Sequence, residues 1–353
     1  MRGFFRILSL FTAATVLSAA VISCVETEQN AYLRSLRHIG MTYINPVDSA
    51  SLSDVEKFLA MDVVKADDWL IMNSDGRSAF HLMFYNLKTS EHFLALRKGR
   101  GPGEIIQPAC LQKHDGKILI YDIDKRFFFS VNVHETVSTK MAFLDTIASF
   151  GESFSKPSGI ACCGKHEFIT TNLISDDVWY SYSDWSGKIL SSVPALEYRE
   201  LSDDFDTRVS RLISSFLVSS PDGTKACVAN IGFPAISFSS VKEGTLTEYR
   251  RYAYPAMGFR GTSITEDLVE NFSSLQADEE YVYALYSGNK LRSGVLPAYE
   301  SRHLIVYNWS GEPVRHFFLS RNITHFFVEG RRLYCDSSYP DFNVYVYDLG
   351  RYL

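Results

Sequence analysis

Short apolar and aromatic runs alternate with turn residues from about residue 66 to the end of the chain, and hardly any helical periodicity interrupts them. Residues 69–99, WLIMNSDGRSAFHLMFYNLKTSEHFLALRKG, contain three such runs, separated by an Asp-Gly pair and a short polar segment. Val, Ile, Tyr and Phe, which fill the runs, favour a pleated and half-buried surface. Asp-Gly between such runs is a strong hairpin signal because glycine supplies the positive φ of a tight turn. The pattern therefore predicts an all-β protein.

The same scheme of strands and tight turns recurs along the chain. Asp184-Trp185-Ser186-Gly187 and Asn308-Trp309-Ser310-Gly311 occupy the same place in the third and fifth copies. Antiparallel units of roughly fifty residues, repeated about six times, predict a six-bladed β-propeller with four-stranded blades. The rival architecture is one long β-sandwich or two, but sandwiches do not require one repeating hairpin scheme. The recognisable part of each copy begins near residues 69, 111, 159, 217, 275 and 324.

The sequence also predicts how the ring of blades closes and which segments interrupt its strands. An open propeller would leave unpaired strand edges. We expect the strand around HIGMTYINP, residues 38–46, to pair with the C-terminal VYVYDL and close the ring. SLSDVEKFLAM (51–61), with Ser53 as a candidate helix cap, and LSDDFDTRVSRLISSF (201–216) break the β rhythm. Both are predicted to contain short helices inserted in the scaffold, where insertions often shape a binding face.

The start of the chain has the pattern of a secretory signal. Arg2 and Arg6 form a positive segment, and an apolar run from Ile7 to Ile22 follows. The segment Val21-Ile22-Ser23-Cys24 resembles the bacterial lipoprotein signal, or lipobox, in which the cysteine thiol is acylated and becomes the new N-terminus. The alternatives are an ordinary signal peptide with a cysteine there by chance, and an uncleaved membrane anchor.

Lipidation at Cys24 divides the chain into three parts. We assign residues 1–23 to a lipoprotein signal peptide, 24–35 to a lipidated tether and 36–353 to the propeller. Acyl chains anchor a protein without spanning the membrane, and each buried methylene adds roughly 0.8 kcal/mol of membrane affinity. The Val-Glu-Thr-Glu-Gln that follows the cysteine resembles, in a thin version, the surface-export signals of Bacteroidetes lipoproteins. The expected location is the outer membrane, with the periplasmic and the cell-surface face both open.

Composition narrows the class of partner. The 353-residue chain has a net charge of −6, which becomes −8 once residues 1–23 with their two arginines are removed. A negative body argues against nucleic acid and against binding to anionic lipid through charge. Of six cysteines, five remain beside Cys24, so no complete disulfide framework fits. The adjacent Cys162 and Cys163 could form a redox pair, but cysteines in apolar strands are more often core residues.

Residues 96–107, LRKGRGPGEIIQ, first suggest a loop that binds phosphate. Such a loop needs Lys and Ser or Thr after its glycines and a helix behind it, whereas Glu104 and then a strand follow here. Pro102 and Gly103 instead suit the two central positions of a type II turn. We therefore predict a structural turn between blades at Arg100, Gly101, Pro102, Gly103 and Glu104. A ligand contact by Arg100 or Glu104 is the alternative.

The Gly-Arg-Gly-Pro-Gly-Glu run after the first blade resembles the signature of the TolB-like six-bladed β-propeller lipoproteins of Bacteroidetes. YVYALYSG, HLIVYNWSGEPVRHFFL and the terminal VYVYDL look like the closing blades of the same family. The resemblance covers nearly the whole mature chain and implies a propeller in the cell envelope. It supplies no catalytic residues, because the roles of its members are largely undefined.

Catalytic and metal-binding patterns are weak. The nine histidines show no metal-ligand spacing, and no G-x-S-x-G elbow is present. Ser153 and Lys156 fit S-x-x-K without its companion motifs, and Asp203, Asp204 and Asp206 lack the glycine and glutamate of a calcium loop. The sequence therefore names no catalytic residue, metal ligand or cofactor.

Two functions remain open at this stage. The first is an outer-membrane lipoprotein whose propeller binds an envelope protein or a glycan. The alternative is a propeller enzyme, a hydrolase or lyase that acts on an extracellular sugar or lactone in the central funnel. A cluster of His, Asp or Glu side chains that converge at the funnel mouth around a bound cation favours the enzyme, and a funnel lined by Tyr and Phe favours binding. Asp48-Ser49-Ala50 and Asp145-Thr146-Ile147 also resemble the short O-glycosylation sequon of Bacteroidetes envelope proteins.

Overall fold

The computed structural model describes most of the chain after residue 29. The predicted signal peptide, Cys24, Ser153, Lys156, the Asp203–Asp206 cluster and most of the two predicted helical insertions lie outside the described residues. The described residues are 30–52, 60–74, 78–114, 116–150, 157–163, 167–172, 178–195, 214–254, 259–260, 263–264, 269–290, 301–337 and 343–353.

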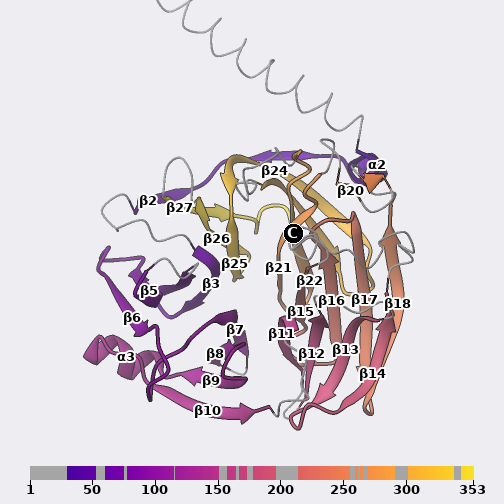
Figure 1. The fold of residues 1–353 in the computed structure, drawn as a ribbon. Coiled ribbons are helices and arrows are strands. Elements are labelled where there is room, and N and C mark those ends of the chain that lie inside the picture. The colour runs from indigo at the N-terminus through magenta and orange to yellow at the C-terminus, as the bar shows by residue number, and fades with distance from the viewer. Residues whose placement is uncertain are drawn as a thin grey trace, which may run out of the picture.

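The described strands form six four-stranded antiparallel blades arranged in a ring (Figure 1), which confirms the predicted propeller. In blades 1 to 5 the chain runs from the innermost strand outward through hairpins, so consecutive strands are neighbours, and in blade 6 the outermost strand comes from the N-terminal segment. The first three blades comprise β3 (Ala60–Ala66), β4 (Trp69–Ser74), β5 (Phe80–Asn86) and β6 (His92–Arg97); β7 (Pro108–His114), β8 (Lys117–Asp122), β9 (Phe127–Val131) and β10 (Leu144–Ser149); β11 (Pro157–Cys163), β12 (Glu167–Asn172), β13 (Val178–Asp184) and β14 (Ile189–Pro194).

The second half of the ring follows the same scheme, with a small hairpin of β19 (Phe259–Arg260) and β20 (Ser263–Ile264) between blades 4 and 5. Blades 4 to 6 comprise β15 (Ser215–Ser219), β16 (Lys225–Asn230), β17 (Ala235–Lys242) and β18 (Thr245–Ala253); β21 (Phe272–Ala277), β22 (Tyr281–Tyr286), β23 (Ser301–Asn308) and β24 (Pro313–Ile323); β25 (His325–Glu329), β26 (Arg332–Ser337), β27 (Asn343–Asp348) and the N-terminal β2 (Asp48–Ser51).

The ring closes through an N-terminal strand, but not through the predicted one. β2 pairs antiparallel with β27, so that Ser49 faces Tyr345. The expected strand at 38–46 instead contains β1 (Thr42–Ile44), which pairs in parallel with β24 as a fifth strand of blade 5. The buried Ile44 side chain packs among the apolar residues between blades 5 and 6, which explains the apolar pattern that misled the prediction. The closing strand is outermost and needs little apolar surface.

The core lies between neighbouring blades, where one blade's inward-facing aromatic side chains meet the next. Between blades 4 and 5, Phe238 and Tyr307 place their ring centroids 5.4 Å apart. The helix α2 (Ala31–Ser35) and the following 3₁₀ turn η1 (Arg37–Ile39) pack against this same interface. All five cysteines of the described chain are free and buried, as the core interpretation predicted for Cys162 and Cys163.

The repeated Trp-Ser-Gly segments are equivalent turns between the third and fourth strands of blades 3 and 5. Asp184 Oδ1 accepts hydrogen bonds from the backbone N–H groups of Ser186 and Lys188, at 2.9 and 3.1 Å. Asn308 Oδ1 accepts the corresponding bonds from the residues two and four positions later, at 3.1 and 2.9 Å. Gly187 and Gly311 have positive φ, 83° and 79°. The internal repeat seen in the sequence therefore corresponds to one turn geometry.

Most of the two predicted helical insertions lie outside the described residues, so those helices stay predictions. The segment predicted as helical at 51–61 begins in β2 and ends in β3, and the one at 201–216 ends in β15. The structure adds α3 (Val133–Thr139) between β9 and β10, capped by Asn132, whose Oδ1 accepts from the Glu135 N–H at 3.1 Å while its Nδ2 donates to the Glu135 carboxylate. No described helix is long and apolar enough to cross a membrane.

Candidate functional site

The first strand of each blade lines the central channel. β3, β7, β11, β15, β21 and β25 contact one another in that order, and β25 contacts β3 to complete the circle. Lys65, Lys113 and Glu329 lie near the ends of three of these strands and meet one another, so these strands run in the same direction. We name the face at which the inner strands begin the start face, and the opposite face the far face.

An acidic and imidazole cluster lies toward the start face, where blades 6 and 1 meet. Asp62 of β3 accepts a hydrogen bond from the Leu111 N–H of β7 at 3.1 Å. Asp336 Oδ1 accepts from the His325 N–H at 2.9 Å and lies 3.6 Å from the imidazole Nδ1. Burial raises the pKa of Asp62 to about 6, and the nearby His325 opposes this rise. Asp62 therefore changes charge near neutral pH.

Three charged side chains meet toward the far-face ends of the inner strands of blades 1, 2 and 6. Glu329 of β25 receives the Nζ atoms of both Lys65 and Lys113, the second at 2.9 Å. Burial alone would raise the pKa of Glu329, but the two lysine hydrogen bonds outweigh it and hold this pKa below its ordinary value. The Lys65 ammonium also lies 5.4 Å from the centre of the Tyr334 ring. This group, named here the ion triad, joins the first, second and last blades.

Side chains also bridge the inner strands of blades 2, 3 and 4. Gln112 donates from Nε2 to the Ile160 carbonyl at 3.3 Å and accepts from the Cys162 N–H at 3.2 Å. Ser219 donates to the Cys162 carbonyl at 2.5 Å. Each blade forms its backbone hydrogen bonds within its own sheet, so backbone groups that face the neighbouring blade need side-chain partners. Much of the polar wall of the channel therefore holds the blades together.

Among the described residues, the channel groups named above can form hydrogen bonds and transfer protons. Within the described part of the chain, no three His, Cys, Asp or Glu side chains are grouped closely enough to hold a metal ion. Asp62, beside His325, is the channel carboxylate whose raised pKa suits acid–base chemistry. The structure thus places one carboxyl group with a raised pKa, Asp62, toward the start face and a self-neutralised group toward the far face.

The glycine motif forms the loop from β6 to β7 at the start face. The Glu104 N–H donates to the Gly101 carbonyl at 3.2 Å, and Gly103 has a φ of 72°. Pro102 and Gly103 thus occupy the central positions of a type II turn. Arg100 is exposed, and although it and Glu104 are both described, no ion pair joins them.

Glu104 folds back into the loop instead of pointing to solvent. Its Oε2 accepts a hydrogen bond from the Gly101 N–H at 2.8 Å. A Cβ added to Gly99 would lie 2.0 Å from the same oxygen, and one added to Gly101 would lie 2.9 Å from it. The alternation of glycines is therefore explained by the room that the Glu104 carboxylate needs.

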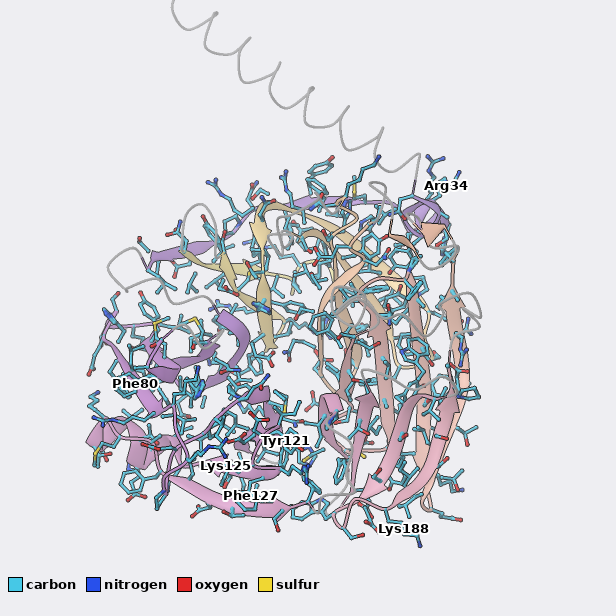
Figure 2. The ribbon with its side chains drawn as sticks, in the orientation of Figure 1. Arg34, Phe80, Tyr121, Lys125, Phe127 and Lys188 are labelled. Carbon is cyan, nitrogen blue, oxygen red and sulfur yellow. The ribbon has the colours of Figure 1, made fainter. Side chains whose placement is uncertain are left out.

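Three side chains from blades 1 and 2 hold this loop. Lys125 Nζ donates to the carbonyls of Gly101 and Glu104, at 3.2 and 2.6 Å (its position is labelled in Figure 2). Buried His81 contacts the Ile105 carbonyl through Nε2 at 3.0 Å, and burial lowers the pKa of this imidazole. Buried Asp122 accepts the Ile106 N–H at 2.7 Å. The loop therefore has a structural explanation for its unusual composition.

Sequence reasoning missed Asp62, Lys65, Lys113, His325 and Glu329. They come from blades 1, 2 and 6 and meet only because the ring closes. The sequence signal that could have found them is a charged residue inside an otherwise apolar inner strand.

The two predicted glycosylation segments lie on outermost strands. Ser49 is exposed on β2 and Thr146 is exposed on β10. Both hydroxyl-bearing residues are thus accessible to a modifying enzyme, and their glycosylation stays a prediction.

Solved structures share this fold with little sequence identity. A member of the DUF4221 family from Bacteroides vulgatus is 10% identical, with a TM-score of 0.50, covering 85% of this chain and 95% of that one. Regucalcin from Agrobacterium tumefaciens, described as a calcium-binding protein, is 12% identical with a TM-score of 0.51, covering 87% and 95%. These likenesses show the fold alone. No curated protein matches the chain.

The family description "TolB-like 6-blade propeller-like" matches residues 47–331. This range begins just before the closing strand β2 and ends at the turn between β25 and β26, so it includes strands of all six blades. The match agrees with the resemblance carried by the glycine motif and with the observed ring of blades. The chain belongs to the TolB-like six-bladed propeller family.

Proposed function

We propose that the protein is an outer-membrane lipoprotein, anchored through Cys24, whose propeller serves as a binding module for an envelope protein or a glycan. The lipobox-like Val21-Ile22-Ser23-Cys24 supports the anchor. The rigid ring supports the binding role, because propellers present many loops and turns from a fixed scaffold. The periplasmic and cell-surface sides of the membrane both fit this proposal.

The observation that carries the binding role is how the channel uses its charged and polar groups. Glu329 is neutralised by Lys65 and Lys113, and Gln112 and Ser219 hold the inner strands together. Such groups have structural partners already, so they are poorly available for a chemical step. The exposed turns and loops at the two faces are the surfaces that remain free to meet a partner.

The proposal is tested by capturing partners of the lipidated protein from gently solubilised outer membranes of its host. The Cys24→Ser variant, which has no thiol to acylate, is the matched control. We expect one partner in near-stoichiometric amount, identified by mass spectrometry, that is recovered with the parent protein and lost with Cys24→Ser. Recovery of the protein with neither an envelope protein nor a glycan bound would contradict the binding role.

One observation favours the alternative function, an enzyme acting on an extracellular sugar or lactone. Asp62 and His325 lie together toward the channel mouth, and the pKa of Asp62 is about 6. A carboxyl group with a pKa near the working pH is suited to general acid–base catalysis.

The enzyme alternative has a simple test. The Cys24→Ser protein is assayed for hydrolysis or elimination with panels of glycosides and sugar lactones between pH 5 and 8. An enzyme that uses Asp62 loses its activity in Asp62→Asn, but keeps it in Glu329→Gln, which alters a carboxylate toward the far end of the channel. No turnover of any substrate by the parent protein counts against this alternative.

A further inference from the structure

The chain's first described residues are fixed to the propeller. Asn30 caps α2 by accepting from the Leu33 N–H at 3.1 Å, and its Nδ2 donates to the Tyr286 hydroxyl at 2.6 Å. The Tyr32 hydroxyl meets that of Tyr307 at 2.5 Å. Tyr32, Leu33 and Leu36 are buried between blades 4 and 5. Residues 30–35, which the sequence analysis assigned to the tether, are thus held on the body.

This docking site lies at the start face. The Tyr32 ring lies 5.2 Å from that of Phe272, the first residue of β21, and 4.6 Å from that of Tyr286, the last residue of β22. It also lies 5.8 Å from Tyr254, which directly follows β18. An inner strand begins, and the second and fourth strands of a blade end, at the start face. The helix α2 therefore covers the start face where blades 4 and 5 meet.

The chain between the anchor and this docking site is short. Asn30 follows Cys24 by six positions, with five residues between them. A fully extended chain spans at most about 3.6 Å per residue, so this distance is at most about 22 Å. An inner strand of seven residues, such as β3, already spans about 23 Å from the start face to the far face. The tether is therefore too short to pass around a blade.

From these distances we propose that the lipid anchor holds the start face toward the bilayer and turns the far face away from it. The proposal rests on the lipidation in the proposed function. The channel mouth with Asp62 and the glycine motif then faces the lipid headgroups. A soluble envelope protein or glycan meets the far face, with turns such as Asp184–Lys188.

Energy transfer to a lipid dye tests this orientation in the full lipidated protein reconstituted into phospholipid vesicles. A donor is attached at Arg100→Cys, on the start face between blades 1 and 2, or at Lys242→Cys, the exposed last residue of β17 on the far face. Arg100 lies across the ring from α2, so its label reports the whole face rather than the attachment point. The five cysteines among the described residues are buried, and burial raises the pKa values of their thiols, so they label slowly.

Because the strands separate the two faces by about 20 Å, we expect transfer from Arg100→Cys to be roughly twofold higher than from Lys242→Cys. A flexible Gly/Ser insert of about twenty residues after Cys24 is the control, and it should abolish most of this difference. Equal transfer from both sites, or stronger transfer from Lys242→Cys, overturns the orientation while leaving the anchor intact. A protein that stays off the vesicles overturns the lipid anchor, and with it both proposals.

Discussion

Gly99→Ala tests whether the Glu104 carboxylate packs the loop between blades 1 and 2 as the structure shows. The new methyl group would lie 2.0 Å from Glu104 Oε2 and 2.7 Å from its Cδ. Neither separation is sterically allowed, so the carboxylate must leave. Gly99 is not among the glycines with positive φ, and its backbone accepts alanine. The cost of the substitution therefore comes from Glu104.

The expected magnitude follows from the hydrogen bond that is lost. Displaced Glu104 can no longer accept the Gly101 N–H at 2.8 Å. Hydrogen bonds to charged groups contribute roughly 1.5–3 kcal/mol, and the half-buried position of Glu104 places this bond at the lower end, about 1.5 kcal/mol. Gly99→Ala should reduce the free energy of unfolding by that amount.

A double-mutant cycle measured by urea unfolding separates this mechanism from a general effect of alanine. In the Glu104→Ala background the clash is absent, so we expect Gly99→Ala to cost about zero there, or to stabilise slightly through a less flexible unfolded chain. An equal loss in both backgrounds would refute the reasoning, because the cost would then not depend on Glu104.

Three further predictions concern buried groups. Burial, with mutual repulsion for His303, lowers the pKa values of His303 and His316, which lie 2.9 Å apart, to about 3 and 4. As the pH falls, the unfolded chain binds protons at these imidazoles before the folded protein does. Their contribution to the free energy of unfolding is therefore complete above pH 6.5 and falls toward pH 4 by up to about 1.4 kcal/mol per pH unit for each imidazole. His316→Gln should flatten that fall in urea titrations, and an unchanged slope contradicts the account. Burial raises the pKa of Glu270 to about 8, so the stabilising contribution of this carboxyl group is lost as the pH rises from 4.5 to 8. Glu270→Gln should therefore be more stable than the parent protein at pH 8 in thermal melting. A less stable variant argues against a buried carboxyl. Tyr32→Ala should expose residues 30–36 to protease while Tyr32→Phe, which keeps the buried ring, stays protected; equal cleavage of both variants means that the ring does not hold the segment.

The propeller could be predicted because its signal is repeated. Each blade contributes hairpins with tight-turn residues, and the equivalent turns at Asp184 and Asn308 show that the repeat is physical. The same local signal says little about strands that interact with few neighbours. The closing strand Asp48–Ser51 is mostly exposed, so it carries no apolar alternation, and the sequence pattern favours the more apolar segment around Ile44 instead.

The inner strand of blade 1 is the other element that the sequence pattern does not predict. Ala60–Ala66 contains Asp62 and Lys65, and these charged residues interrupt the apolar run that marks a buried strand. Their charges are tolerated because Lys65 meets Glu329 and Asp62 accepts a backbone N–H. Such partners come from other blades, so local pattern reasoning could not anticipate them.

The candidate site depends on contacts that only the closed ring creates. Lys65 and Glu329 are separated by 264 positions in the chain, yet they form an ion pair. By contrast, the turn at Pro102 and Gly103 could be derived from the sequence, because its conformation is set by neighbouring residues. The packing of Glu104 against Gly99 could not, since it depends on how the side chain folds back.

The anchor at Cys24 is the claim on which both the proposed function and the proposed orientation depend. The most direct measurement is the intact mass of the protein extracted from membranes of its host, with Cys24→Ser alongside. The account predicts a chain that begins at Cys24 and carries a covalent lipid, and no lipid on the Cys24→Ser protein. A parent chain that begins elsewhere, or begins at Cys24 without added lipid, would contradict it.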